Sequence, residues 1–396
     1  TATTEIYTFS LHDALPILIM KYRTFLKTGE KISLLGFGTM RLPVKDGDFA
    51  KVDEAETIRM IRAAIDRGVN YVDTAYMYHD GMSEVATGNA LKDGYREKVL
   101  LADKLPLWMA KTPEDMERIF NDQLKRLDVD CIDMYLVHSV SAPVWKRAVK
   151  YNAIDFLEKK QAEGRIKHIG FSFHDDFEVF EEVLKAYPWD FCQIQLNYMD
   201  TDFQAGVKGL KLAGSMGIPV IVMEPLKGGK LTDVLPQSIK DFWDQAEVKR
   251  TPAEWALRWV ADFPEVLTIL SGVSTMEQAD ENIRILSEAD PGSLTEAEHK
   301  LIQNVADEYN NLIRYSCTGC QYCMPCPVKI NIPDIIGRYN DWFVYEGNEK
   351  IMSDFKMWVN PKAMPSVCEE CGACEAHCPQ HLPVPEIMKK AKEIFE

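Results

Sequence analysis

The sequence predicts an α/β protein with two parts: a (β/α)8 TIM barrel and, after it, a small C-terminal domain of α-helices and loops. Short apolar runs alternate with amphipathic helical segments over about 250 residues, the chain length that eight βα units need. Eight of the ten cysteines then fall in two tight runs near the C-terminus. A doubly wound sheet is the alternative for the first part, but no Gly-x-Gly-x-x-Gly loop follows the first expected strand.

The expected elements begin with a hairpin and continue as strand–helix units. Residues 22–26 and 31–35 are the hairpin strands, with residues 28–30 as the turn. Barrel strands are expected near Gly36 and over residues 71–73, 99–104, 132–138, 166–171, 191–195, 220–223 and 266–270. Apolar residues at helical spacing predict helices over residues 52–67, 113–127, 152–163, 203–216 and 252–262.

The chain divides into four segments at changes in this pattern. Residues 1–19 begin without Met and show neither a helical period nor the layout of a signal peptide, so we expect a non-native leader before Met20. The strand–helix alternation ends near Gly292, which bounds the barrel at residues 20–292. A linker over residues 293–316, with a helix at about 295–312, leads into the cysteine-bearing domain of residues 317–396.

Charge and hydropathy exclude several classes of partner. The chain has 45 Lys and Arg against 61 Asp and Glu, a formal charge of −16, and no block of basic residues. Nucleic acid and anionic membrane surfaces are therefore not expected partners. No apolar run reaches the roughly 18 residues of a membrane span, so we expect no membrane partner. The clustered cysteines and the lack of a signal-peptide pattern favour the cytoplasm.

Each cysteine run spaces its thiols closely and ends in Cys-Pro. The first run contains Cys317, Cys320, Cys323 and Cys326, and the second contains Cys368, Cys371, Cys374 and Cys378. Both resemble bacterial two-cluster ferredoxins, although the first run has two residues in place of three before its last cysteine. The resemblance implies two 4Fe–4S clusters with crossed ligation: Cys317, Cys320, Cys323 and Cys378 on one, and Cys368, Cys371, Cys374 and Cys326 on the other.

Two other interpretations of the cysteine runs are open. Four thiolates can also hold zinc, although zinc sites usually pair two separated Cys-x2-Cys units instead of four cysteines in one run. Alternatively, the clusters form and only brace the fold.

Polar residues follow three successive strands at the end where barrel enzymes carry their reactive groups. Asp73 and Lys104 end two strands, Tyr78 follows five residues after Asp73, and His138 ends the next strand. Taken singly, each would more often be a packing residue or part of a structural ion pair. Their order and spacing, within residues 22–286, resemble the aldo-keto reductases, and the resemblance implies that these four residues form that family's catalytic tetrad.

The chemistry implied is reduction of a carbonyl or oxidation of an alcohol. Hydride delivery to a carbonyl leaves an alkoxide that needs a proton, which Tyr78 would supply. A phenol with a pKa near 10 is a poor donor at neutral pH, so Lys104 would lower the pKa of Tyr78, and Asp73 would hold Lys104. His138 would donate a hydrogen bond to the carbonyl oxygen.

The same resemblance implies a nicotinamide dinucleotide, NAD or NADP. Ser172 and Gln193 would contact the nicotinamide amide, with Gln193 favoured over Gln195 on the same strand face. Met223 stands where many members carry an aromatic ring. The pyrophosphate loop would contain Pro225, Leu226 and Gly228, and the adenosine side would contain Ser271, Gly272, Ser274, Gln278 and Asn282. This last loop lacks an Arg or Lys to pair with a 2′-phosphate, which favours NAD over NADP.

Together these features predict an oxidoreductase of aldo-keto reductase type with a small-molecule carbonyl or alcohol substrate. Its barrel would use NAD(P), and its clusters would pass electrons to a separate redox protein partner. Nicotinamide moves two electrons as hydride while each cluster accepts one, and the sequence shows no signature of a flavin that would join the two steps. The alternative is a barrel without catalysis that serves an electron-carrying or redox-sensing module.

Overall fold

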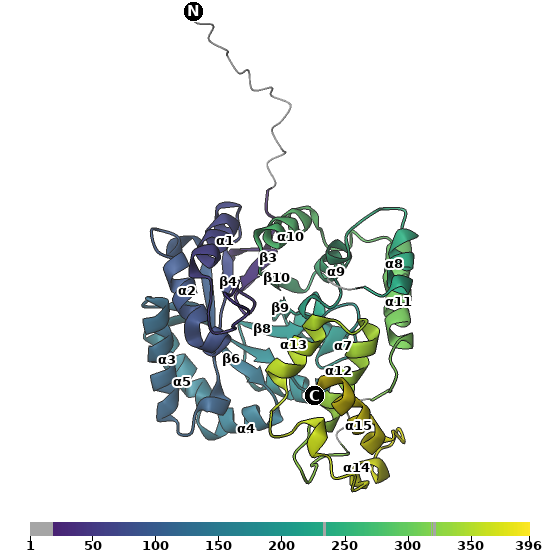
Figure 1. Ribbon diagram of the computed structural model, residues 1–396. Helices are drawn as coiled ribbons and strands as arrows, with labels where there is room; N and C mark the ends of the chain where they lie inside the picture. Colours follow the sequence, from purple (N-terminus) through teal and green to yellow (C-terminus); the bar gives the residue numbers. More distant parts are fainter. Residues whose placement is uncertain (1–18, 233–234, 318, 320–321) are drawn as a thin grey trace, which may run out of the picture. The chain divides into compact units, whose positions relative to one another are not determined.

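The computed structural model describes residues 19–232, 235–317, 319 and 322–396, and the chain forms two compact units. The first unit comprises the chain up to Pro225 together with Ala256–Leu294, and the second comprises Leu226–Trp255 and Thr295–Glu396. Figure 1 follows the chain from the first strands in purple to the C-terminal helices in yellow. Among the helices of the described residues, none is both long enough and apolar enough to cross a membrane.

The first unit is built on a closed barrel of parallel strands (Figure 1). Each strand pairs with its neighbours in chain order, and β10 pairs with β3 to close the ring. The strands are β3 (Leu35–Gly38), β4 (Tyr71–Asp73), β5 (Leu100–Leu105), β6 (Ile132–Val140), β7 (Ile166–Phe173), β8 (Phe191–Gln195), β9 (Val220–Met223) and β10 (Val266–Gly272). The predicted (β/α)8 barrel is therefore confirmed.

Helices connect the strands and cover the outside of the barrel. They are α1 (Glu54–Asp66), α2 (Met82–Ala90), α3 (Glu114–Leu127), α4 (Ala142–Lys150), α5 (Ala153–Ala162), α6 (Phe177–Ala186), α7 (Gly206–Ser215), α9 (Pro252–Ala261), which leads back into the unit, and α10 (Met276–Glu288). Because the strands are buried on both faces, their sequences are almost continuous apolar runs. This burial explains why the strands could be located from the sequence.

Alternate residues of each strand point into the barrel. On β5 the inner core contains Leu100 and Ala102, and on β6 it contains Met134 and Leu136. The residues between them point outward to the helices. This period of two decides which side chain each strand presents at the end of the barrel.

An antiparallel hairpin of β1 (Tyr22–Thr24) and β2 (Lys31–Ser33) precedes the barrel, as predicted. Phe25 and Ile32 are fully buried and join the inner core with Tyr71 and Met134. Tyr71 opens β4 and Met134 lies near the start of β6, so the hairpin fills the end of the barrel at which the strands begin.

The second unit is helical. It contains α8 (Gln237–Asp244), α11 (Glu296–Asn311), α12 (Ile332–Val344), α13 (Glu349–Trp358), α14 (Ala373–Ala376) and α15 (Val384–Phe395). α8 packs against α11, and α12 packs against α15. The ring of Phe355 stacks on the ring of Phe395, with centroids 4.0 Å apart. A capping box between Thr295 and Glu298 begins α11, close to the start of the helix expected from the sequence.

Candidate active site

Six inward-facing side chains meet at the end of the barrel where the strands finish. Each lies two residues after an inward-facing residue of its own strand; Tyr71, Ala102 and Leu136, for example, belong to the inner core. The period of two therefore carries the ends of six neighbouring strands to one rim. The six side chains are those of Asp73, Lys104, His138, Ser172, Gln193 and Met223.

Tyr78 reaches the rim from the turn that follows β4. The next three residues, His79, Asp80 and Gly81, have φ angles of 52°, 53° and 89°. Two consecutive non-glycine residues in the left-handed region are unusual and need support from their surroundings. The ring of His79 gives that support, because its Nδ1 donates to Phe49 O at 2.6 Å and its Nε2 accepts from the Leu42 N–H at 3.2 Å.

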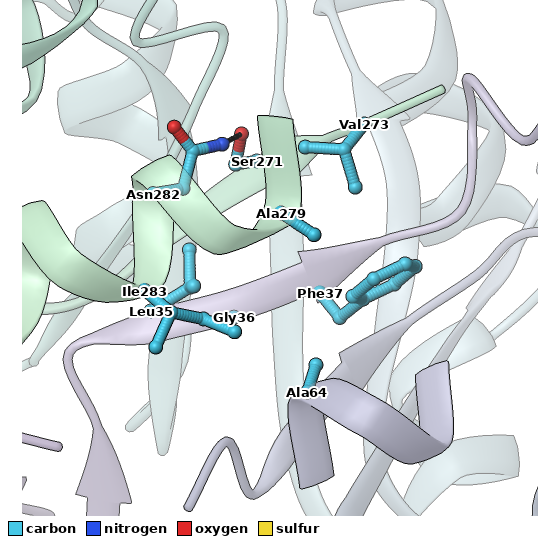
Figure 2. Close-up of a pocket in the computed structure, with 9 residues that line it drawn as sticks. All are labelled: Leu35, Gly36, Phe37, Ala64, Ser271, Val273, Ala279, Asn282 and Ile283. Atoms are coloured by element: carbon cyan, nitrogen blue, oxygen red, sulfur yellow. Dashed lines mark hydrogen bonds between the residues drawn. The ribbon is translucent and has the colours of Figure 1, made fainter. Parts of the chain in front are cut away.

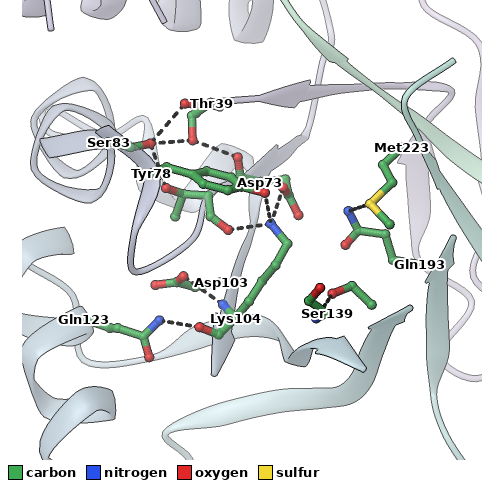
Figure 3. A network of polar contacts seen from close by, with 12 residues as sticks. Thr39, Asp73, Tyr78, Ser83, Asp103, Lys104, Gln123, Ser139, Gln193 and Met223 are labelled. Atoms are coloured by element: carbon green, nitrogen blue, oxygen red, sulfur yellow. Dashed lines mark hydrogen bonds and ion pairs between the residues drawn. The ribbon is translucent and has the colours of Figure 1, made fainter. Parts of the chain in front are cut away.

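The Lys104 ammonium is the centre of the site (Figure 3). Its Nζ lies 2.5 Å from Asp73 Oδ1, 2.7 Å from Thr74 O and 3.4 Å from the Tyr78 hydroxyl. The side chains of Lys104 and Asp73 are only 1% and 4% exposed. Each of the three ammonium protons therefore has an acceptor in a site that water hardly reaches.

His138 lies beside Tyr78 and presents a neutral imidazole. The two rings meet edge to face with centroids 6.1 Å apart, and the indole of Trp108 lies 5.0 Å from the imidazole on another side. Burial, with contributions from Lys104 and His174, holds the pKa of His138 well below its ordinary value. His138 Nδ1 is buried without a hydrogen-bond partner among the described residues. A neutral imidazole offers one N–H donor to a substrate oxygen.

Burial also determines the pKa of Tyr78. Tyr78 as a whole is half-buried, but its hydroxyl lies next to the buried Lys104 ammonium. Burial raises the pKa of Tyr78, and Lys104 lowers it by less, so the pKa lies above 10. The sequence led us to expect a lowered value. The difference arises because a phenolate loses its hydration at this depth, and one cation compensates only in part.

The pKa values of Asp73 and Lys104, the ion pair beside Tyr78, are raised as well. Burial raises the pKa of Asp73 in spite of the nearby ammonium of Lys104. Burial lowers the pKa of Lys104, but Asp73 and Tyr78 outweigh that effect and keep it above its ordinary value. The site therefore holds a charged lysine at neutral pH.

Ser172 and Gln193 are neighbours across the pairing of β7 with β8. Ser172 Oγ accepts from the Ser139 N–H at 2.7 Å, and Gln193 Nε2 lies 3.7 Å from Met223 Sδ (Figure 3). Gln193 Oε1 is buried and has no hydrogen-bond partner in the part of the chain that the structure describes. An unsatisfied buried acceptor of this kind fits the amide N–H of a nicotinamide.

Gln195 is the alternative on the same strand face. Its Nε2 donates to Asp200 Oδ2 at 2.8 Å. Its amide group is thus already engaged within the barrel, which favours Gln193 for ligand contact.

Ser271, Gly272, Ser274, Gln278 and Asn282 lie together where β10 ends and α10 begins. Asn282 Nδ2 donates to Ser271 Oγ at 2.8 Å, and the Ser274 N–H donates to Gln278 Oε1 at 2.9 Å. Figure 2 shows Ser271 and Asn282 at a small cavity between β3, α1 and α10. The other lining residues are Leu35, Gly36, Phe37, Ala64, Val273, Ala279 and Ile283, so this cavity is an apolar gap in the packing beneath the loop.

Arg41, in the connection from β3 to α1, lies against this same loop. Ser274 Oγ donates to Arg41 O at 2.8 Å, and a Cβ added to Gly272 would come within 3.4 Å of Arg41 Cβ. Arg41 precedes Ser274 by 233 residues, which is why the loop's own sequence gave no sign of it. The adenosine-side loop thus has a cationic residue beside it, although its own sequence contains neither Arg nor Lys.

The expected pyrophosphate loop contains the point at which the chain passes from the first unit to the second. Pro225 is the last residue before the chain leaves the first unit, whereas Leu226 and Gly228 belong to the second. Lys227–Gly229 forms a 3-10 turn in which Gly228 has a φ of 66°, a conformation that favours glycine.

Comparison with known families identifies the barrel. The model of the Aldo/keto reductase family matches residues 34–307, more than half of the chain. This chain belongs to the aldo/keto reductase family. A second family model, the 4Fe-4S dicluster domain, matches residues 316–382. The aldo/keto reductase barrel is therefore followed by a ferredoxin-like 4Fe–4S domain, as the sequence predicted.

Three relatives show how far the aldo/keto reductase similarity extends. The NADH-specific methylglyoxal reductase of Escherichia coli (strain K12) is 28% identical over 321 residues, which are 70% of this chain and 95% of that protein. An aldo-keto reductase from Bacillus halodurans in its holo form is 27% identical, with a TM-score of 0.60 over 72% of this chain and 96% of the other. An aldo-keto reductase from Klebsiella pneumoniae in complex with NADPH is 25% identical, with a TM-score of 0.59 over 73% and 95%.

The cysteines of the 4Fe–4S domain lie near the protein surface. Cys371 is exposed, Cys320 lies outside the described residues, and the others are half-buried: Cys317, Cys323, Cys326, Cys368, Cys374 and Cys378. Burial raises the pKa of Cys374, and Cys368 and Cys371 act in the same direction. No three His, Cys, Asp or Glu side chains of the described residues converge as ligands of a metal ion. The fit to 4Fe–4S clusters rests on the donor set, which is eight thiols in two runs that resemble those of ferredoxins.

Two features of the aldo/keto reductase site were missed in the sequence. Trp108 stands four residues after Lys104, and its position beyond a strand end was a usable signal for a residue at the rim. The carbonyl of Thr74 carries no sequence signal, because any residue offers the same group.

Proposed function

We propose that this aldo/keto reductase uses a nicotinamide dinucleotide to interconvert a small-molecule carbonyl compound and its alcohol. Asp73, Tyr78, Lys104 and His138 are then its catalytic residues. The observation that carries the proposal is the Tyr78 hydroxyl 3.4 Å from an ammonium that Asp73 holds at 2.5 Å. The bound dinucleotide would supply or accept the hydride.

In the direction of reduction, Tyr78 donates its phenolic proton to the oxygen on which charge develops. Because burial keeps the pKa of Tyr78 above 10, the phenol stays protonated through neutral pH. Lys104 stabilises the phenolate that proton transfer leaves behind. Neutral His138 donates its N–H to the same oxygen and fixes its direction.

Residues from both halves of the barrel would hold the dinucleotide. Ser172 and Gln193 would contact the nicotinamide amide, and Met223 would lie against the ring. The remaining contacts would come from Pro225, Leu226, Gly228, Ser271, Gly272, Ser274, Gln278 and Asn282.

We propose NAD as the preferred dinucleotide. Among the relatives, the Escherichia coli protein is named as NADH-specific, and the Klebsiella structure holds NADPH. Tighter binding of NADH than of NADPH, measured by fluorescence titration, is the expected result. If NADPH binds more tightly, Arg41→Ala will show whether Arg41 causes that preference.

The cysteine runs would bind two 4Fe–4S clusters with crossed ligands, within a domain of residues 317–396 that follows a barrel of residues 20–292 and a linker of residues 293–316. The clusters would exchange single electrons with a redox protein partner. A thiol-rich chain of this kind suits a reducing compartment, the cytoplasm.

The test is anaerobic purification with iron and sulfide analysis, followed by turnover of methylglyoxal and other small aldehydes with NADH and NADPH. About eight irons per chain are expected from two four-iron clusters. Turnover should be lost in Tyr78→Phe. Zinc in place of iron would contradict the cluster proposal. Cofactor oxidation that needs a one-electron acceptor and ignores Tyr78→Phe would favour a barrel without carbonyl chemistry.

A further inference from the structure

A second pair of buried acidic residues lies directly behind Lys104, outside the set of catalytic residues. Strand alternation turns Asp103 outward from the barrel, toward the helices, where Lys104 turns inward. Asp103 on β5 and Glu84 on α2 are both completely buried. Burying two negative charges next to each other, away from water, costs free energy, so the two carboxyl groups are not both expected to be ionised.

One oxygen of each carboxyl group already has a donor. Glu84 Oε2 accepts from Arg126 Nη1 at 2.7 Å, and Asp103 Oδ1 accepts from the Lys104 N–H at 2.7 Å. The other two oxygens, Asp103 Oδ2 and Glu84 Oε1, are buried and make no hydrogen bond of ordinary geometry with a donor among the described residues, although the Gln123 side chain lies near Glu84. The two side chains lie within hydrogen-bonding reach of each other.

Ionised carboxylates only accept hydrogen bonds, so two of them cannot satisfy each other. A single proton between them satisfies both, and it leaves one negative charge opposite the one positive charge of Arg126. Burial, with the charge of Glu84, raises the pKa of Asp103 well above its ordinary value. Burial raises the pKa of Glu84 too, but Arg126 opposes that shift. The raised pKa values favour one proton on the pair as a whole.

Two side chains hold the backbone of Lys104, one at its N–H and one at its carbonyl oxygen. Asp103 Oδ1 accepts from the Lys104 N–H, and Gln123 Nε2 donates to Lys104 O at 2.9 Å. Gln123 is oriented in turn by the Tyr135 hydroxyl, which donates to its Oε1 at 2.5 Å. Side chains of β5, α3 and β6 therefore fix the main chain from which the Lys104 side chain extends to Tyr78.

We propose that Asp103 and Glu84 share one proton and, through that bond, position Lys104 for catalysis. The part that concerns catalysis rests on the function proposed above, whereas the shared proton does not. The titratable and charged groups that face the pair are Lys104 on its own strand, Arg126 on α3 and Tyr135 on β6.

The shared proton has a direct spectroscopic test. A protonated carboxyl group has an infrared C=O stretching band separate from that of a carboxylate, and the band shifts in D2O. The wild-type protein should show this band at neutral pH, and Asp103→Asn should lack it. Asp133→Asn is the matched control, because Asp133 is a buried carboxylate paired with Arg96 and Lys167, each at 2.7 Å, and its loss should leave the band in place. Absence of the band from the wild type would overturn the proposal.

Kinetics tests the positioning role. Asparagine keeps an oxygen for the Lys104 N–H and an N–H for Glu84, so Asp103→Asn should restore most of the activity that Asp103→Leu loses. We expect Asp103→Leu to reduce kcat about tenfold or more with little change in KM, since only the alignment of Lys104 is disturbed. Equal losses in both variants would overturn the positioning role. If Asp103→Leu does not fold, the infrared comparison still shows whether Asp103 and Glu84 share a proton. Inactivity of the wild type toward aldehydes would contradict only the proposed function.

Discussion

The two ends of the barrel treat buried carboxylates differently. At the end where the strands finish, Asp73 and its cation Lys104 are both almost fully buried, with side chains 4% and 1% exposed. At the opposite end, Asp133 is equally buried, but its cations Arg96 and Lys167 are 22% and 55% exposed. Water screens the second pair and hardly reaches the first.

Because of this difference in screening, we expect the two ends of the barrel to have different roles, catalysis at one and stability at the other. Charges that are not screened act strongly on a neighbouring hydroxyl such as that of Tyr78, which suits the proton transfer that we propose for the rim. Screened charges at the other end hold strand starts in place, since Asp133 Oδ2 also accepts from the Leu101 N–H at 2.8 Å. Mutations at the rim should therefore change turnover, and mutations at the opposite end should change only stability.

Removal of the Tyr78 hydroxyl should give the largest effect. Tyr78→Phe takes away the proposed proton donor, and we expect kcat for aldehyde reduction to fall by about 10²–10⁴-fold. KM and the urea midpoint should change little, because the hydroxyl makes only a 3.4 Å contact with Lys104. Steady-state kinetics and urea unfolding of the same preparation check both statements. A variant with wild-type kcat would show that the proton comes from elsewhere.

The pH dependence of reduction tests the raised pKa of Tyr78. Reduction needs the protonated phenol, so activity is lost as the pH rises through that pKa, which burial keeps above 10. We therefore expect kcat/KM to stay level through neutral pH and to decline only in strongly alkaline solution. A decline centred near pH 7 would mean that the Lys104 charge outweighs burial, as the sequence alone had suggested.

The next largest effect is expected when the buried ion pair of Lys104 and Asp73 is broken. Lys104→Met leaves Asp73 buried without its cation, and we expect a loss of about 3–5 kcal/mol in the free energy of unfolding. Without Lys104 the pKa of Asp73 rises further, so the folded protein takes up a proton that the unfolded chain releases. Stability should then fall as the pH rises above the unfolded value of about 4. Urea unfolding at several pH values measures this, and the double variant with Asp73→Asn should recover much of the loss.

The acidic pair behind Lys104 should give a smaller, pH-dependent effect. Because the pKa of Asp103 is raised in the folded state, the wild type loses stability as the pH rises between the unfolded and folded values, by up to about 1.4 kcal/mol per pH unit. Asp103→Asn has no such proton, so it should become more stable relative to the wild type with rising pH. A stability difference that does not change with pH would contradict a raised pKa.

The smallest effect is expected at the opposite end. Asp133→Asn should lower the free energy of unfolding by about 1–3 kcal/mol, the usual result of disturbing a buried hydrogen-bonded group. Because this site is remote from the rim, kcat/KM should remain within about twofold of the wild type. A tenfold loss of kcat would remove the distinction between the two ends.

The sequence predicted the barrel well because parallel strands buried on both faces leave apolar runs that few other elements produce. It also located Asp73, Lys104 and His138, since each ends such a run. It did not indicate α2, whose sequence, Met82–Ala90, has no clear apolar period because polar side chains such as Ser83 and Thr87 are buried there. The strand starts and ends shifted by only a few residues.

Two kinds of feature could not be predicted from the sequence. One is contact between residues that are far apart in the chain, and the other is how deeply a side chain is buried. Glu84 and Asp103 each look like an ordinary surface acid, and only the packing of α2 on the barrel brings them together. Arg41 meets the adenosine-side loop across 233 residues of chain. The direction in which the pKa of Tyr78 shifts depends on whether burial outweighs the nearby charge of Lys104. The spacing of residues along the chain carries no information on how deeply a side chain is buried.

The composition of the second unit limits how the chain can be divided. Leu226–Trp255 belongs to that unit although it lies between β9 and β10 in the chain, and its helix α8 packs on α11. A cut near residue 294 would therefore separate α8, which contains the fully buried Ile239, from α11. The cysteine-bearing end is thus not an independent cassette, and a gene fusion that transferred it to another enzyme would have to transfer this internal segment as well.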